Sequence, residues 1–98
     1  MNCNKLSFIE GQSYIAKMND ESISITFFQA KGKKIKVLAE ANKIFSGTDD
    51  KVIINGCEFK VQSVDDAFAS NAIIKFASTH KLPNAINELD IIDLEYLG

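Results

Sequence analysis

The sequence predicts an α+β fold: a small domain dominated by antiparallel β-hairpins that form a curled sheet or partial barrel, with one helix at about residues 63–80. Turn signals that contain glycine separate short runs of alternating apolar and polar residues, as in half-buried antiparallel strands. A later stretch instead carries apolar residues at helical spacing. The chain has 98 residues, the length of one ordinary domain, so a single domain over residues 1–98 is expected.

The first hairpin is expected within residues 5–18. A loop at residues 10–12 would place Phe8 opposite Tyr14. A short helix over residues 13–18, "SYIAKM", is the competing interpretation, and the sequence leaves both open.

A second hairpin is predicted for "SISITFFQAKGKKIKVLAE". Residues 30–32 form a three-residue loop in which Gly32 takes the left-handed position that such loops need. Phe28 falls on the polar face and is predicted to cover a sheet edge or to contact a partner. The loop predicts a buried face made of the cross-strand pairs Phe27–Ile35, Ile25–Val37 and Ile23–Ala39.

The clearest hairpin is "KVIINGCEFKV", residues 51–61. Asn55-Gly56 favours a two-residue type I′ turn, because both central residues of that turn have positive φ. Apolar side chains then share one face, with Ile53 the exception on the other, and a one-residue slip would mix the two faces. The turn predicts the cross-strand pairs Ile54–Cys57, Val52–Phe59, Ile53–Glu58 and Lys51–Lys60.

The stretch "SGTDDKVIINGCEFKVQSVDD", residues 46–66, resembles a hairpin pattern of tailed-phage head–tail connector proteins. In those proteins an apolar strand, a glycine turn and a Phe-x-Val strand build part of a small β-barrel. The resemblance implies a barrel, a structural role in a phage-type head–tail assembly and an origin in a phage or mobile element. It assigns no functional residue.

The helix at about residues 63–80 is predicted from its expected N-terminus. Ser63 and Asp66 have the spacing of a capping box, which satisfies backbone N–H groups in the first helical turn. A strand over residues 72–78 is the alternative, because its two adjacent isoleucines are poor helix formers. Residues 89–97 alternate apolar and acidic side chains, so a C-terminal strand is preferred there over a helix.

The basic residues are the main candidate for a binding surface. All eleven are Lys, and four of them, Lys31, Lys33, Lys34 and Lys36, occupy the tip of the second hairpin beside Phe28. These five residues form the predicted interaction surface; the competing explanation is that the lysines keep an edge hairpin from aggregating. A nucleic-acid partner is disfavoured, because the bidentate recognition that Arg provides is absent.

Cys57 and His80, the single His, are the residues from which a nucleophile and base could be assembled. The favoured interpretation makes Cys57 a small buried residue on the core face of its hairpin and His80 an exposed residue near the helix end. In a reducing cytosol Cys3 and Cys57 are expected to be free thiols, with a bridge between them as the alternative. We therefore predict no catalytic residue.

Metal, cofactor and membrane sites are also not expected. The acidic pairs at residues 20–21, 49–50 and 65–66 lack calcium-loop spacing and suit turns and caps. The apolar runs are too short to span a bilayer, and the N-terminus lacks a signal-peptide core, so a cytoplasmic location is expected.

These observations favour a small non-enzymatic interaction or adaptor domain that binds a protein partner or itself. Residues 1–47 carry seven Lys against four acidic residues, and residues 48–98 carry four Lys against nine. This asymmetry suggests a homodimer in which the basic hairpin pairs with the acidic C-terminal region. The alternatives are a nucleic-acid-binding accessory protein that uses the Lys31–Lys36 hairpin, a phage-type head–tail protein and a barrel that encloses a ligand pocket.

Overall fold

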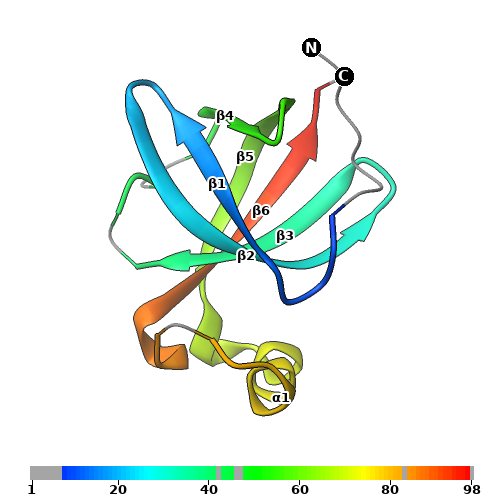
Figure 1. The fold of residues 1–98 in the computed structure, drawn as a ribbon, viewed down its shortest axis with the longest axis vertical. Helices are drawn as coiled ribbons and strands as arrows, with labels where there is room; N and C mark the ends of the chain where they lie inside the picture. The colour runs from blue at the N-terminus through cyan, green and yellow to red at the C-terminus, as the bar shows by residue number, and fades with distance from the viewer. Residues whose placement is uncertain (1–7, 42, 46–47, 83, 98) are drawn as a thin grey trace.

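Six antiparallel strands form a closed barrel in the computed structural model, which describes residues 8–41, 43–45, 48–82 and 84–97. The order of strands around the barrel is β1-β2-β3-β6-β5-β4, and one α-helix lies below it (Figure 1). The strands are β1 (Ser13–Met18), β2 (Glu21–Lys31), β3 (Lys34–Glu40), β4 (Lys51–Ile54), β5 (Cys57–Asp66) and β6 (Leu89–Tyr96). The helices are α1 (Asn71–Thr79) and the single 3₁₀ turns η2 (Ala67–Ala69) and η3 (Ile86–Glu88).

The barrel closes through a short seam between β1 and β4, where only Ala16 and Lys17 pair, with Ile54 and Ile53. The seam between β3 and β6 is far longer and runs over the whole of β3. Closure gives each of the six described strands a partner on both sides, which protects against the edge-to-edge pairing that leads to aggregation. The predicted small α+β domain with a curled sheet is therefore confirmed, and the sheet curls until it closes.

Inward-pointing side chains of all six strands fill the barrel as a single apolar core. Phe59 is fully buried at its centre, with ring centroids 5.7 Å from Tyr96 and 6.3 Å from Phe8. Phe8 comes from the segment before β1 and also stacks against Tyr14 at 5.0 Å. Because these aromatic rings come from distant parts of the chain, the core ties the first and last strands together.

Two β-bulges interrupt the regular alternation of side chains. In β2 the register with β3 shifts between Phe27 and Gln29, so Phe28 is the extra residue. In β5 the register with β6 shifts between Val61 and Ser63, so Gln62 is the extra residue. Successive strand residues point to opposite faces, so one extra residue reverses which face the following residues occupy. Side chains after each bulge that would otherwise point inward therefore point outward.

The Asn55-Gly56 hairpin has the predicted register, from Lys51↔Lys60 to Ile54↔Cys57. Its apolar face is buried. Ile53, the one apolar residue predicted on the polar face, is 45% exposed there.

The register predicted for the second hairpin is wrong by two residues. Its loop is the two-residue Gly32-Lys33 turn, with φ of 61° at Gly32, rather than a three-residue loop. A glycine with positive φ at the first central position is typical of a type II′ turn. The bulge at Phe28 then makes Phe27 oppose Val37 and Ile25 oppose Ala39. A shift of two residues preserves the faces, so the core residues were still correctly identified.

The N-terminal segment departs from both interpretations. Residues 13–18 form strand β1, so the helix alternative is wrong, and β1 pairs with β2 and β4 rather than with the segment before it. A turn does occur near Gly11 (φ 88°), where the Gln12 N–H donates to the Ile9 carbonyl at 3.1 Å. Residues 5–7 of the predicted hairpin lie outside the described residues.

The predicted start of the helix is wrong by eight residues. Strand β5 continues to Asp66, and α1 begins at Asn71 with Ser70 as its N-cap, whose Oγ accepts from the Ile73 N–H at 3.3 Å. Ser63 instead donates to Asp93 Oδ2 at 3.0 Å across the β5–β6 seam. Pairing with β6 therefore outweighs the local capping signal. Residues 72–78 are helical and residues 89–96 form a strand, so the preferred secondary structure is confirmed for both segments.

Helix α1 packs on the outside of the barrel against a second apolar cluster. Phe28, on the outer face of β2, meets Phe76 edge-to-face with ring centroids 4.9 Å apart. Leu38 and Ile91, opposite each other on β3 and β6, complete the surface that the helix covers. A helix of nine residues is too short to be stable alone, so its order depends on this contact.

We predict that Phe28→Ala loosens α1 while the barrel persists. Loss of the Phe28–Phe76 contact should speed amide hydrogen exchange throughout α1 more than in β3 or β6. Phe59→Ala should instead lower the free energy of unfolding of the whole domain by about 3–5 kcal/mol. Phe68→Ala is the matched control, because Phe68 is 57% exposed and should leave exchange in α1 unchanged. Unchanged helix exchange in Phe28→Ala would contradict this role.

Candidate functional site

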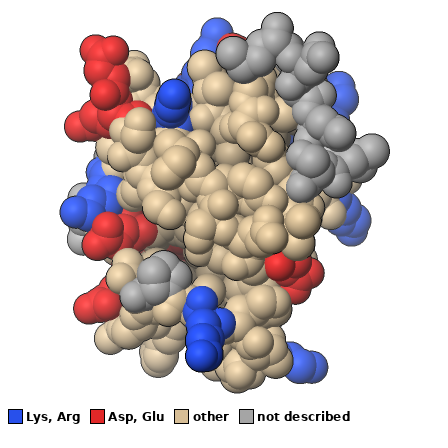
Figure 2. Space-filling model, in the orientation of Figure 1, with Lys and Arg blue, Asp and Glu red and all other residues tan. Residues whose placement is uncertain are grey.

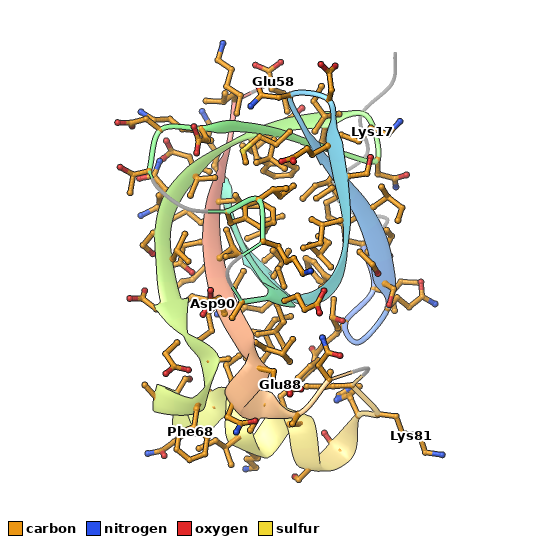
Figure 3. The ribbon with its side chains drawn as sticks, turned by 90° about the vertical axis from the view of Figure 1, so that its left-hand side faces the viewer. Lys17, Glu58, Phe68, Lys81, Glu88 and Asp90 are labelled. Atoms are coloured by element: carbon orange, nitrogen blue, oxygen red, sulfur yellow. The ribbon has the colours of Figure 1, made fainter. Side chains whose placement is uncertain are left out.

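Cys57 and His80 lie at opposite ends of the molecule. Figure 3 shows their sequence neighbours, Glu58 at the upper end of the barrel and Lys81 beside the helix at the lower end. Cys57 is fully buried and disulfide-bonded, so the expected free thiol is wrong for this residue. Cys3, the other cysteine of the chain, lies outside the described residues. The pair therefore cannot act as nucleophile and base.

His80 is half-buried and has a packing role at the end of α1. Its ring stacks on Phe76 with centroids 4.1 Å apart, and its Nδ1 lies 3.1 Å from the Phe76 carbonyl oxygen. A Cβ on Gly11 would meet the His80 ring at 2.5 Å. His80 therefore fills the space between α1 and the turn before β1.

The acidic pairs act locally. Asp49 has φ of 70° in the loop before β4 and forms an ion pair with Lys60 at 3.1 Å. Asp66 caps η2 by accepting from the Phe68 N–H at 3.1 Å. Within the described part of the chain, no three His, Cys, Asp or Glu side chains converge as a metal site would require.

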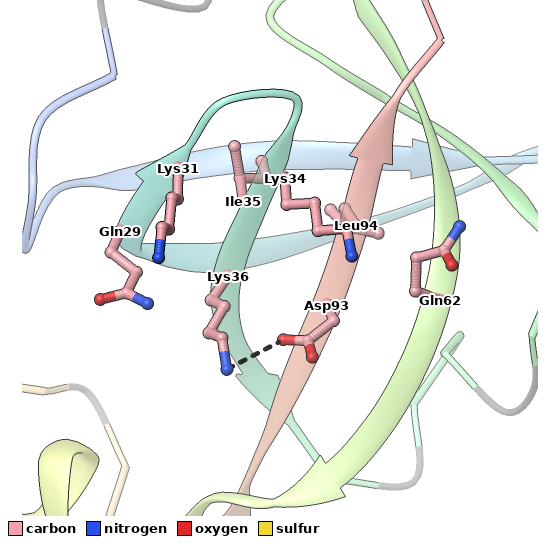
Figure 4. Close-up of a pocket in the computed structure, with 8 residues that line it drawn as sticks. All are labelled: Gln29, Lys31, Lys34, Ile35, Lys36, Gln62, Asp93 and Leu94. Carbon is pink, nitrogen blue, oxygen red and sulfur yellow. Dashed lines mark ion pairs between the residues drawn. The ribbon is translucent and has the colours of Figure 1, made fainter.

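Three of the four predicted lysines line a pocket on the outer face of the barrel, as Figure 4 shows. The pocket has a volume of about 160 Å³ and spans four neighbouring strands. Its walls are the polar side chains Gln29 and Lys31 of β2, Lys34 and Lys36 of β3, Asp93 of β6 and Gln62 of β5, and its remaining lining comes from Ile35 and Leu94. Lys33 sits in the adjoining turn instead. We call this the lysine pocket.

Phe28, the fifth residue of the predicted surface, is only 9% exposed, because it lies beneath α1. It contacts the chain's own helix and is not part of the exposed surface around the lysine pocket. The pocket residues that sequence reasoning missed are Gln29, Gln62 and Asp93. Their position beside the lysines could not be predicted from the sequence, because two bulges and the distant strand β6 bring them there.

Opposite charges from the two halves of the sequence pair within one chain. Lys36 Nζ, from the first half, lies 3.6 Å from Asp93 Oδ1, from the second half. Lys34 stands opposite Glu95 in the β3–β6 register. The charge asymmetry that suggested pairing between two copies is thus partly neutralised within the barrel.

A second candidate surface covers the outer face of β1 and β4, with the adjoining part of β2. Ile15 is 52% exposed and Ile53 is 45% exposed, on strands that pair directly. A hollow of about 480 Å³ lies beside them, lined by Tyr14, Ile15, Lys17, Ile53, Asn55 and Gly56. Figure 2 shows a broad uncharged area at the centre of this side of the molecule. We call this the isoleucine face; in sequence its one signal was Ile53 on a polar hairpin face.

We predict that Cys57 resists alkylation until the protein is reduced. Iodoacetamide should leave Cys57 unlabelled in the native protein and in unfolded, unreduced protein, because the sulfur is buried and disulfide-bonded. Mass spectrometry should find labelling only after unfolding with a reductant. Fast labelling of the native protein would instead indicate the accessible thiolate that a cysteine enzyme needs.

Comparison with known proteins gives no family for the chain. No protein-family model matches it, and neither a curated protein nor a solved structure is similar to it. No helix in the described part of the structure is long and apolar enough to cross a membrane.

Proposed function

We propose that this chain is a small non-enzymatic interaction domain that self-associates through its isoleucine face. The observation that carries the proposal is the exposure of Ile15 and Ile53, 52% and 45%, on adjacent strands of the barrel. Single exposed apolar residues are ordinary on protein surfaces, but neighbouring ones beside a hollow are typical of docking sites.

The surroundings of the two isoleucines support a second copy of the chain as the occupant. Serines 13, 22 and 24 supply uncharged hydroxyl groups around Ile15, which suit the polar rim of an interface. Lys17 lies between Ser22 of β2 and Ile53 of β4, next to the acidic turn at Asp20 and Glu21. Because Lys17 and the acidic turn bring both signs of charge to this face, a two-fold arrangement can place Lys17 of one copy near the acidic turn of the other.

The hollow beside Ile53 gives each copy a place for a partner side chain. It lies where β1 runs past the Asn55-Gly56 turn of β4 and β5. In an isologous dimer the same Ile of each copy would enter the hollow of the other, which buries apolar surface twice. This arrangement differs from the pairing of basic hairpin with acidic C-terminal region, whose charges are partly used within the chain.

We predict concentration-dependent dimerisation that depends on Ile15 and Ile53. Sedimentation equilibrium should detect a monomer–dimer equilibrium, and the double variant Ile15→Thr/Ile53→Thr should weaken it at least about tenfold, since it removes apolar contact area from both copies. Thr keeps a high strand propensity, so the barrel should stay folded.

Ile74→Thr is the matched control, because Ile74 is 42% exposed on α1, away from this face, and should leave the equilibrium unchanged. A chain that stays monomeric at high concentration, or one whose association ignores both substitutions, would refute the proposal. Binding of a different protein at Ile15 and Ile53 by a monomeric chain would also overturn it, in favour of a heterologous partner.

A further inference from the structure

The lysine pocket is assembled by the two β-bulges, which lie on strands at its opposite sides. Without the bulge at Phe28, Gln29 and Lys31 would continue the inward face that carries Ile25 and Phe27. With it, Gln29 stands opposite Lys36 and Lys31 opposite Lys34, on the outer face. Bulges occur often beside functional sites because they redirect side chains.

The bulge at Gln62 acts in the same way from the other side. It turns Ser63 outward, opposite Asp93, where the Ser63 hydroxyl donates to Asp93 Oδ2 at 3.0 Å. Gln62 itself lines the pocket. Two interruptions in separate strands therefore direct polar side chains to one strip of β3 and β6, independently of the lysine run in the sequence.

The charges of the pocket suit an anion. Lys31 and Lys34 contribute two ammonium groups for which no carboxylate lies within ion-pair distance among the described residues. The amides of Gln29 and Gln62 add N–H donors at the two sides, as Figure 4 shows. Lysine binds phosphate oxygens as a point charge, without the geometry that Arg imposes.

Asp93 adds a requirement on the ligand. Its Oδ2 accepts from Ser63, but its Oδ1 is shielded from solvent and accepts no hydrogen bond within the described part of the chain. Lys36 Nζ, 3.6 Å away, is beyond hydrogen-bond distance. A buried carboxylate oxygen without a donor is unfavourable, so a ligand with an O–H group would satisfy it.

We propose that the lysine pocket binds a small protonated phosphate group, either free hydrogen phosphate or a phosphate monoester. Its anionic oxygens accept from Lys31 and Lys34, and its P–OH group donates to Asp93 Oδ1. A phosphate monoester, with a second pKa of about 6, keeps a proton in part of its population near neutral pH, and hydrogen phosphate keeps an O–H group in all of it. Sulfate has the same shape but no proton to donate, and a nucleic-acid phosphodiester also lacks one, so both should bind poorly.

The test is a titration of the full chain with inorganic phosphate, methyl phosphate, sulfate and a single-stranded oligonucleotide at pH 6.5, followed by amide chemical shifts. Phosphate and methyl phosphate should shift the amides of residues 29–36 and 92–94, and sulfate should bind at least about tenfold more weakly, because one charged hydrogen bond is lost. Binding of methyl phosphate alone would identify a monoester as the ligand class. Lys31→Gln and Lys34→Gln should each weaken phosphate binding several-fold.

Two variants separate this site from general attraction to lysines. Lys75→Gln, on α1, should leave phosphate binding unchanged. Asp93→Asn should abolish the preference for phosphate over sulfate while the spectrum stays that of a folded barrel. The proposal fails if neither inorganic phosphate nor methyl phosphate shifts a pocket amide, if wild-type protein binds sulfate as well as it binds phosphate, if Lys75→Gln weakens binding as much as Lys31→Gln, or if the oligonucleotide binds at this site.

Discussion

The extra residue at Phe28 is the constraint on which the rest of the architecture depends. Side chains of a strand alternate with a period of two, so each strand of a closed barrel can serve the core with only half of its residues. One inserted residue moves the side chains that follow it from one face of the strand to the other. Before the bulge β2 contributes Ile25 and Phe27 to the interior, and after it Gln29 and Lys31 to the outer surface.

Phe28 itself also has a packing role. Because its ring points outward, it provides the aromatic contact that holds α1 against the barrel. Through Phe76 the same contact extends to His80, which fills the space beside Gly11. The helix and the turn before β1 thus depend on the Phe28 ring, and the lysine pocket depends on the bulge at Phe28. The isoleucine face does not, since Ile15 and Ile53 lie across the barrel seam on β1 and β4.

The sequence predicts those parts of the fold whose causes are local. Asn55-Gly56 sets its own turn type, so the pairing of its hairpin and the burial of Phe59 follow from a few residues. The bulges at Phe28 and Gln62 could not be predicted in this way, because each is fixed by how two strands fit a closed barrel. Ser63 illustrates the same limit: its capping spacing was correctly noticed, but an oxygen of Asp93, thirty residues away, is its partner.

The candidate sites divide along the same line. Three lysines of the pocket were recognised because they are neighbours in the sequence, whereas Asp93, Gln29 and Gln62 reach them only in three dimensions. Ile53 was noted as an exception to its face, but its significance depends on Ile15 from β1, which the sequence could not place beside it. The charge asymmetry suggested a homodimer because the sequence does not show that β6 places its acidic residues directly beside the lysines of β3.

The most direct test of this account is the pattern of cross-strand NOEs between β2 and β3 in the free protein. We predict contacts that pair Phe27 with Val37 and Gln29 with Lys36, which is the signature of one extra residue at Phe28. A regular hairpin, in which Phe28 opposes Lys36 and Gln29 opposes Ile35, would place Gln29 and Lys31 on the inner face. That result would contradict the origin of the lysine pocket.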